Sequence, residues 1–208
     1  MQTKKEQAGA EREKPAFSRE LLCTYRDLLR STDLQRAYQE FIRLFRYLRG
    51  ALERQMPDYR FQSNISENAM AYAYFSCTDS AGKTAGLKYS VVFVHAAFRL
   101  EVWISGVNRS AQCRWAKQLG ACPPPAERAA DPAHADYLVR LPVEAELSDG
   151  EAVVAAVRKA LLQAARLLDC GRNGPAEARH SACTADRKGD RTDGSDQGEP
   201  IPQPGAPA

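Results

Sequence analysis

Two β-strand patterns separated by only two residues constrain the fold of this chain more than any other feature. Residues 86–95 (GLKYSVVFVH) are rich in β-formers, and residues 98–105 (FRLEVWIS) alternate between apolar and polar side chains. The connection, Ala96-Ala97, is too short for anything except a tight antiparallel hairpin. The implied register pairs Phe93 with Leu100, Val91 with Val102 and Tyr89 with Ile104 on one face, and Val94 with Arg99, Val92 with Glu101, Ser90 with Trp103 and Lys88 with Ser105 on the other.

Apolar side chains at helical spacing predict four helices around this hairpin. A first helix over 17–30 has Ser18 as its expected N-cap, and a second helix runs from Leu34 until Pro57 ends it. After the hairpin, Asn108 or Ser110 caps a short helix that ends before a glycine. The two helices after the hairpin are expected over residues 109–119 and 149–169.

Two further strands complete the prediction. Residues 69–77 alternate small and large side chains, and residues 136–147 form a strand that Pro142 pushes toward an edge or a bend. The predicted order is α-α-β-β-β-α-β-α. Because the strands pair locally and the helices are grouped around them, we expect an α+β domain: a mainly antiparallel sheet of about four strands with helices packed on one side.

Composition places this domain between two polar extensions. Residues 1–16 and 171–208 hold too few large apolar side chains to offset their ordering entropy, so we expect disordered tails around a single domain over 17–170. The formal net charge of the whole chain is only +3, which argues against a dedicated nucleic-acid binder. Without a signal peptide or a long apolar run, we expect a cytoplasmic protein with free thiols and no membrane span.

Three motifs suggest chemistry but fit it poorly. The AGKT segment at 81–84 lacks the first glycine of a P-loop and lies in a loop between strands. Cys77 and His95 supply a thiol and a base on neighbouring strands, yet a buried cysteine is usually a small apolar residue. The spacing of Cys113, Cys122 and His134 matches no zinc pattern, so no metal and no cofactor is expected. A catalytic role is therefore uncertain, and a non-catalytic one is favoured.

The order α-β-β-β-α-β resembles in outline the core of PD-(D/E)XK nucleases. In those enzymes, paired acidic residues hold a divalent metal and a nearby lysine stabilises charge on the attacked phosphate. Glu101 stands on the third strand and Glu40 could approach from the helix, but Trp103 occupies the position of the lysine. A metal-dependent hydrolase or nuclease-like enzyme with Glu101 as ligand is therefore kept as the alternative function.

The polar face of the hairpin is the best candidate site. Arg99 and Glu101 place both charge signs beside Trp103, and the strand ends at Gly-Val-Asn-Arg. Charged and aromatic side chains in such an arrangement are typical of a polar pocket. The plainer interpretation is a sheet face covered by the last helix, with Arg99 and Glu101 paired to each other. The candidate ligand-binding residues are Arg99, Glu101, Trp103, Asn108, Arg109, Lys88, Tyr72 and Tyr74.

Residues 91–119 (VVFVHAAFRLEVWISGVNRSAQCRWAKQL) resemble an uncharacterised bacterial family, a domain of unknown function. Its motif is V-F-x-H-x-x-F-R-x-E-V-W-[IL]-x-G-x-N-R, and the likeness runs over most of residues 20–170. The resemblance implies a cytosolic bacterial protein and brings no known activity, cofactor or substrate. The positions that carry it are His95, Phe98, Arg99, Glu101, Val102, Trp103, Gly106, Asn108, Arg109 and Trp115.

The sequence therefore favours a non-catalytic binding or regulatory module. Its expected partner is a small anionic ligand, a peptide or a protein chain held at the face around Arg99, Glu101 and Trp103. A homodimer that uses the tyrosine strand as its interface is the third possibility.

Overall fold

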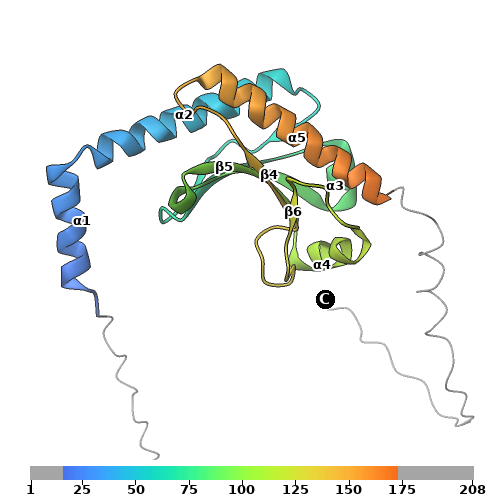
Figure 1. Cartoon of the computed structure of the whole chain (residues 1–208), viewed down its shortest axis with the longest axis horizontal. Coiled ribbons are helices and arrows are strands. Elements are labelled where there is room, and N and C mark those ends of the chain that lie inside the picture. Colours follow the sequence, from blue (N-terminus) through green and yellow to red (C-terminus); the bar gives the residue numbers. More distant parts are fainter. Residues whose placement is uncertain (1–15, 173–208) are drawn as a thin grey trace, which may run out of the picture.

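An antiparallel sheet with two long helices on one face forms the body of the protein (Figure 1). The computed structural model describes residues 16–172, so the predicted tails, apart from their inner ends, lie outside the described residues. The helices are α1 (Arg19–Ser31), α2 (Leu34–Gln55), α3 (Ser80–Ala85), α4 (Arg109–Gln118) and α5 (Gly150–Arg172), with a 3-10 turn η1 (His95–Ala97). The strands are β1 (Arg60–Phe61), β2 (Ser66–Asn68), β3 (Tyr72–Thr78), β4 (Leu87–Val94), β5 (Arg99–Gly106), β6 (Glu127–Arg128) and β7 (Val139–Val143).

The β4–β5 hairpin has the register that the short connection predicts. Phe93 lies opposite Leu100 and Ser90 opposite Trp103, and all the other predicted pairs are present. The turn closes through η1, where the amide of Phe98 donates to the carbonyl of His95 at 3.1 Å. This hairpin lies at the centre of the sheet, whose order is β1-β3-β4-β5-β7-β6 with β2 also paired to β3.

The α+β class is confirmed, but the predicted strand count and element order are wrong. The sheet has seven strands rather than about four. The three additional strands, β1, β2 and β6, are two or three residues long, which is too short for an alternating pattern to be recognised. The AGKT segment is not a plain loop either: it lies in α3, which Asp79 caps by accepting from the amide of Gly82.

The core lies between the sheet and the helices α2 and α5. The apolar stripe of α2 buries Phe45 and Leu48, and the ring of Phe45 packs 5.2 Å from that of Phe75. On α5, Val153, Val157 and Leu161 are fully buried in the same cluster. Figure 1 shows α4 on the opposite side of the sheet, so the prediction that all the helices share one face is wrong for α4.

The first helix projects away from this core. Figure 1 shows α1 turning sharply from the start of α2 and extending away from the sheet, and no residue of α1 is buried. Ser18 caps it as predicted, accepting from the amide of Leu21 at 3.2 Å. No described helix is both long and apolar enough to cross a membrane.

Candidate functional site

Glu101, the centre of the predicted site, is fully engaged by its own strand. Its side chain is only 1% exposed, and Oε1 accepts from Nε of Arg99 at 2.7 Å. Its Oε2 accepts from the indole Nε1 of Trp103 at 2.6 Å. Because residues two apart on a strand share a face, the strand itself builds this arrangement. The plainer interpretation is confirmed for the Arg99–Glu101 pair, although the last helix covers the other face of the sheet.

The structure does bring four of the predicted residues together beside this pair. Tyr72, Tyr74, Lys88 and Trp103 line a small hollow of about 150 Å³ on the open face of the sheet. The rings of Tyr72 and Trp103 lie 5.6 Å apart, and the hydroxyl of Tyr72 donates to Asp136 at 3.2 Å. The remaining lining residues are Ser90, Val92, Ser105 and Asp136.

Asn108 and Arg109 lie outside this hollow and secure the chain after the hairpin. The Oδ1 of Asn108 accepts from the amide of Ala111 at 2.8 Å, which caps α4 as predicted. Arg109 donates to the carbonyl of Ala135 in the long loop before β7. Between β5 and α4, Gly106 is required for space and not for a left-handed backbone. A Cβ at this position would lie 2.5 Å from the amide nitrogen of Gln112, so the tight connection from strand to helix requires glycine.

The residues of the enzyme hypotheses do not meet. Glu40 lies on α2, over the face opposite to Glu101, and forms an ion pair with Arg43. Cys77 pairs with Tyr89, whereas His95 lies at the far end of β4, where its amide donates to Ala71. Burial raises the pKa of the Cys77 thiol to about 12. Among the described residues, no group of three His, Cys, Asp or Glu side chains is arranged to hold a metal ion.

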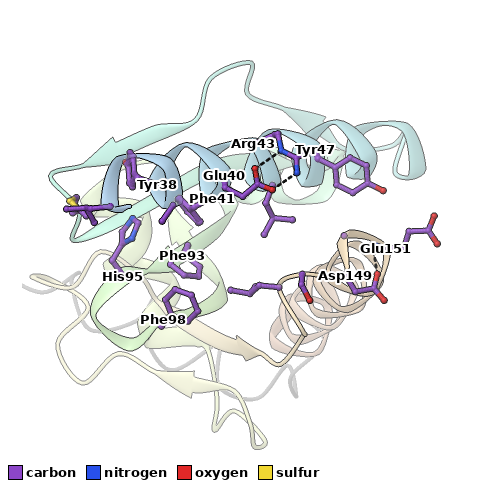
Figure 2. A pocket seen from close by; sticks show the side chains of 17 residues that line it. Tyr38, Glu40, Phe41, Arg43, Tyr47, Phe93, His95, Phe98, Asp149 and Glu151 are labelled. Atoms are coloured by element: carbon purple, nitrogen blue, oxygen red, sulfur yellow. Dashed lines mark hydrogen bonds and ion pairs between the residues drawn. The ribbon is translucent and has the colours of Figure 1, made fainter. Parts of the chain in front are cut away.

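A second and much larger concavity lies on the helical side of the sheet. This groove has a volume of about 970 Å³ and runs between the first half of α2, the η1 turn and the N-terminus of α5. Figure 2 shows Phe41 pointing into it from α2, Phe93 and His95 from the end of β4, and Asp149 and Glu151 at its other end. The ring centroids of Phe41 and Phe93 lie 4.6 Å apart and form the apolar floor.

Two strained turns place apolar side chains on the rim of this groove. Met70 (φ 58°) and Phe98 (φ 48°) both have left-handed backbones, a conformation that residues other than glycine rarely adopt. Their side chains are nevertheless 48% and 74% exposed. The two turns adjoin, because the residue after Met70 accepts from the amide of His95. Each strained turn therefore holds a large apolar side chain in solvent at the mouth of the groove.

His95 is the polar centre of the groove's aromatic wall. Its ring lies 5.1 Å from the rings of Phe41 and Phe93 and 5.9 Å from that of Tyr38. Within residues 16–172, its Nε2 is the one buried side-chain nitrogen or oxygen atom without a hydrogen-bond partner. Burial lowers the pKa of His95 against the opposing charge of Glu67, so the neutral imidazole is favoured.

The edges of the groove carry an excess of negative charge. The lining includes three carboxylates, Glu40, Asp149 and Glu151, against one arginine, Arg43. Asp149 also caps α5, where its Oδ1 accepts from the amides of Glu151 and Ala152 at 3.0 Å. At the other end, the hydroxyl of Tyr38 donates to Glu67, and burial together with this carboxylate raises the pKa of Tyr38 to about 12.

Residue patterns could have found only part of the groove. The apolar stripe of α2 is longer than its contact with the sheet. It continues toward the N-terminus of the helix, beyond the residues that α2 buries, through Leu34, Ala37, Tyr38 and Phe41. That excess is a usable signal of an additional partner. Met70 and Phe98 gave no such signal, because nothing in their local sequence marks a left-handed backbone.

Comparison with known proteins gives a family and no activity. A family model for DUF7000, described as a domain of unknown function, matches residues 18–169, which include both the hairpin and the groove. None of the curated proteins matches the chain, and none of the solved structures does. The match covers most of the chain and agrees with the resemblance carried by residues 91–119. The chain therefore belongs to the DUF7000 family.

Proposed function

We propose that this protein is a non-catalytic binding module whose principal site is the groove between α2, η1 and α5. One observation carries the proposal: Met70 and Phe98 have left-handed backbones, which are unfavourable for residues other than glycine, and yet their large apolar side chains are exposed. Such strain persists where the surrounding structure holds it, and it is typical of binding and switch regions. An exposed apolar patch with a polar rim is typical of a surface that a partner covers.

The occupant that fits best is an amphipathic helix of a protein partner. An aromatic floor favours large apolar anchors at helical spacing, which is the helix-in-groove mode of recognition. The carboxylates Asp149 and Glu151 favour basic residues beside those anchors, whereas Glu40 is already paired with Arg43. We propose the groove in place of the face around Arg99 and Glu101, because that face satisfies its own charges.

The non-catalytic part of the proposal is supported by how the reactive side chains are held. Cys77 is buried with its pKa raised to about 12, which disfavours the nucleophilic thiolate. Both oxygens of Glu101 already accept hydrogen bonds within the chain. The resemblance and the free thiols of Cys23, Cys77, Cys113 and Cys122 support a cytoplasmic location in a bacterium as part of the same proposal.

An apolar dye tests the groove without knowledge of its natural occupant. Nile red, a neutral dye, should fluoresce with the full chain carrying Leu21→Glu and Tyr25→Glu, which removes the exposed apolar face of α1 as a competing site. Adding Phe98→Asp should reduce the dye fluorescence several-fold, since aspartate tolerates the left-handed backbone but removes the apolar rim. Lys117→Gln, at an exposed position of α4, makes the same change of net charge as Phe98→Asp; it is the control and should leave the fluorescence unchanged. Equal fluorescence with and without Phe98→Asp would overturn the proposal.

The small hollow on the open face is a second candidate, for a compact anion. Lys88 lies beside Tyr74 in this hollow and forms no ion pair with any described residue. The two serine hydroxyls are engaged within the chain, since Ser90 bonds to Ser76 and Ser105 donates to the carbonyl of Asp136. An unpaired ammonium group beside a phenol hydroxyl suits an oxyanion. Inorganic phosphate should raise the thermal midpoint of the full chain, and Lys88→Met should abolish that rise. A rise that survives in Lys88→Met contradicts this assignment.

A further inference from the structure

The exposed face of α1 is the feature of this chain that the fold leaves unused. Leu21 and Tyr25 are 70% and 56% exposed, and Phe17, Leu22 and Leu28 extend the same stripe. A helix with one apolar stripe and one charged face is built to bury that stripe. With none of its residues buried, α1 gains little from tertiary packing, and a 13-residue helix is only marginally stable alone.

The corner between α1 and α2 holds α1 apart from the sheet of its own chain (Figure 1). The hydroxyl of Thr32 donates to the carbonyl of Leu28 at 2.6 Å and accepts from the amide of Leu34 at 3.3 Å. The amide of Thr32 also donates to Leu28, which closes the C-terminus of α1. Figure 1 shows the result, with α1 extending away from the sheet. To reach its own groove, α1 would have to break these bonds and leave this orientation.

The stripe and the groove are complementary in chemistry. Large side chains on the stripe match the aromatic floor and the exposed Met70 and Phe98 of the rim. The helix carries Arg19, Arg26 and Arg30 against Glu20 and Asp27, a net charge of 3 − 2 = +1. The lining of the groove carries three carboxylates against Arg43, a net charge of 1 − 3 = −2, so the signs are opposite.

We infer that α1 of one copy docks in the groove of a second copy and that the exchange is reciprocal, giving a two-fold symmetric dimer. This inference rests on the proposed function of the groove and names its occupant. Exchange of an identical element between two copies is symmetric, so it produces two equal contacts at once. In each copy, α1 directly precedes the α2 segment that lines the groove. Two equal contacts bury twice the area of one, which favours a reciprocal exchange over a single docked helix, because stable interfaces bury roughly 1,200–2,000 Å² in total. The dimer therefore uses α1 rather than the tyrosine strand.

Sedimentation velocity of the full chain over a wide range of concentration tests the dimer. The wild-type chain should be a dimer. We define a helix variant, Leu21→Glu with Tyr25→Glu, and a groove variant, Phe98→Asp. The dissociation constant of each variant should be at least roughly tenfold higher than that of the wild type, because each variant lacks apolar anchors. Arg26→Gln with Arg30→Gln makes the same change of net charge on the charged face of α1 and keeps every apolar anchor. This control should associate more tightly than the helix variant, and equal weakening of the two would contradict the role of the apolar anchors.

Mixing the two variants separates exchange from other modes of association. The helix variant keeps an intact groove and the groove variant keeps an intact α1, so the mixture should form a heterodimer that neither variant forms alone. No recovery on mixing would overturn the exchange and would instead favour α1-to-α1 packing.

A monomeric wild-type chain at all concentrations would also overturn the inference. The groove itself is judged separately by the dye experiment. Dye binding that depends on Phe98 in a monomeric protein would retain the proposed function and reject this occupant.

Discussion

The indole nitrogen of Trp103 donates a 2.6 Å hydrogen bond to the carboxylate of Glu101, two residues away on the same strand. Arg99 holds the other oxygen from the opposite side, at 2.6 Å through its terminal nitrogen. Three residues that suggest a ligand site are thereby a closed unit in which each charge is neutralised inside the chain. The unit stabilises the centre of the sheet and leaves binding to other surfaces.

This unit should be costly to break. Glu101→Gln should lower the free energy of unfolding by about 2–3 kcal/mol, since it replaces two charge-assisted bonds of a buried carboxylate with weaker ones. Urea unfolding followed by circular dichroism measures the change. Arg99→Met should cost at least as much, because it leaves the buried carboxylate of Glu101 without its charge partner. Arg140→Met is the control and should cost about 1 kcal/mol or less, because the carboxylate of its partner Glu127 is 54% exposed. A Glu101→Gln protein as stable as wild type would show that the bonds contribute little.

The left-handed backbone of Met70 predicts a stabilising substitution. A non-glycine residue in this conformation costs roughly 1–2 kcal/mol, and the added entropy of unfolded glycine offsets roughly 0.5–1 kcal/mol of that, so Met70→Gly should gain about 0.5–1 kcal/mol. Met70→Ala keeps the strain and should gain nothing. The denaturant midpoints of the wild type, Met70→Gly and Met70→Ala test this prediction. An unchanged or lower midpoint for Met70→Gly would count against strain at this turn. Met70→Gly should also weaken binding in the groove, because it removes part of the rim.

His95 should make the fold sensitive to mild acid. Its pKa is lowered in the folded protein, so below about pH 6.5 the unfolded chain binds the proton first and the free energy of unfolding falls. Above that pH the neutral ring is common to both states and the slope disappears. His95→Gln should flatten the part of the profile between the lowered pKa and pH 6.5. Phe75→Leu, which destabilises the same core but keeps the imidazole, should retain the slope, and a similar slope in His95→Gln would assign it to other groups.

Cys77 should be chemically inert while the protein is folded. Burial raises its pKa to about 12, and its side chain is only 2% exposed. Iodoacetamide at neutral pH should leave Cys77 unmodified in the folded protein and label it after denaturation, as mass spectrometry of digests would show. The partly exposed Cys23 and Cys113 serve as internal controls for the reagent. Rapid native labelling of Cys77 would reopen the thiol hypothesis.

Local patterns predicted the parts of this fold that depend on neighbouring residues. The two-residue connection fixed the pairing of Phe93 with Leu100, and the cap at Asn108 followed from its own side chain. The short strands β1, β2 and β6 escaped prediction because their hydrogen bonds come from distant partners. Tertiary packing, rather than propensity, decides such elements.

The candidate site was harder to predict than the fold, for a physical reason. A charged, aromatic strand face attracts attention in a sequence, but Arg99 and Glu101 neutralise each other once their side chains are placed. The groove depends on turns at Met70 and Phe98 whose backbone conformation is imposed from outside the local sequence. The groove was not predicted from the sequence, and the one usable signal is the continuation of the apolar stripe on α2 past its buried residues.

A photo-crosslinker in the groove is the most direct test of the central claim. Benzoylphenylalanine in place of Phe98 would report what covers the rim in the full-length protein. In an equal mixture of ¹⁴N- and ¹⁵N-labelled chains, the account predicts crosslinks from position 98 to residues 17–28 that join chains of different label. Crosslinks confined to single chains, or none to α1, would contradict it.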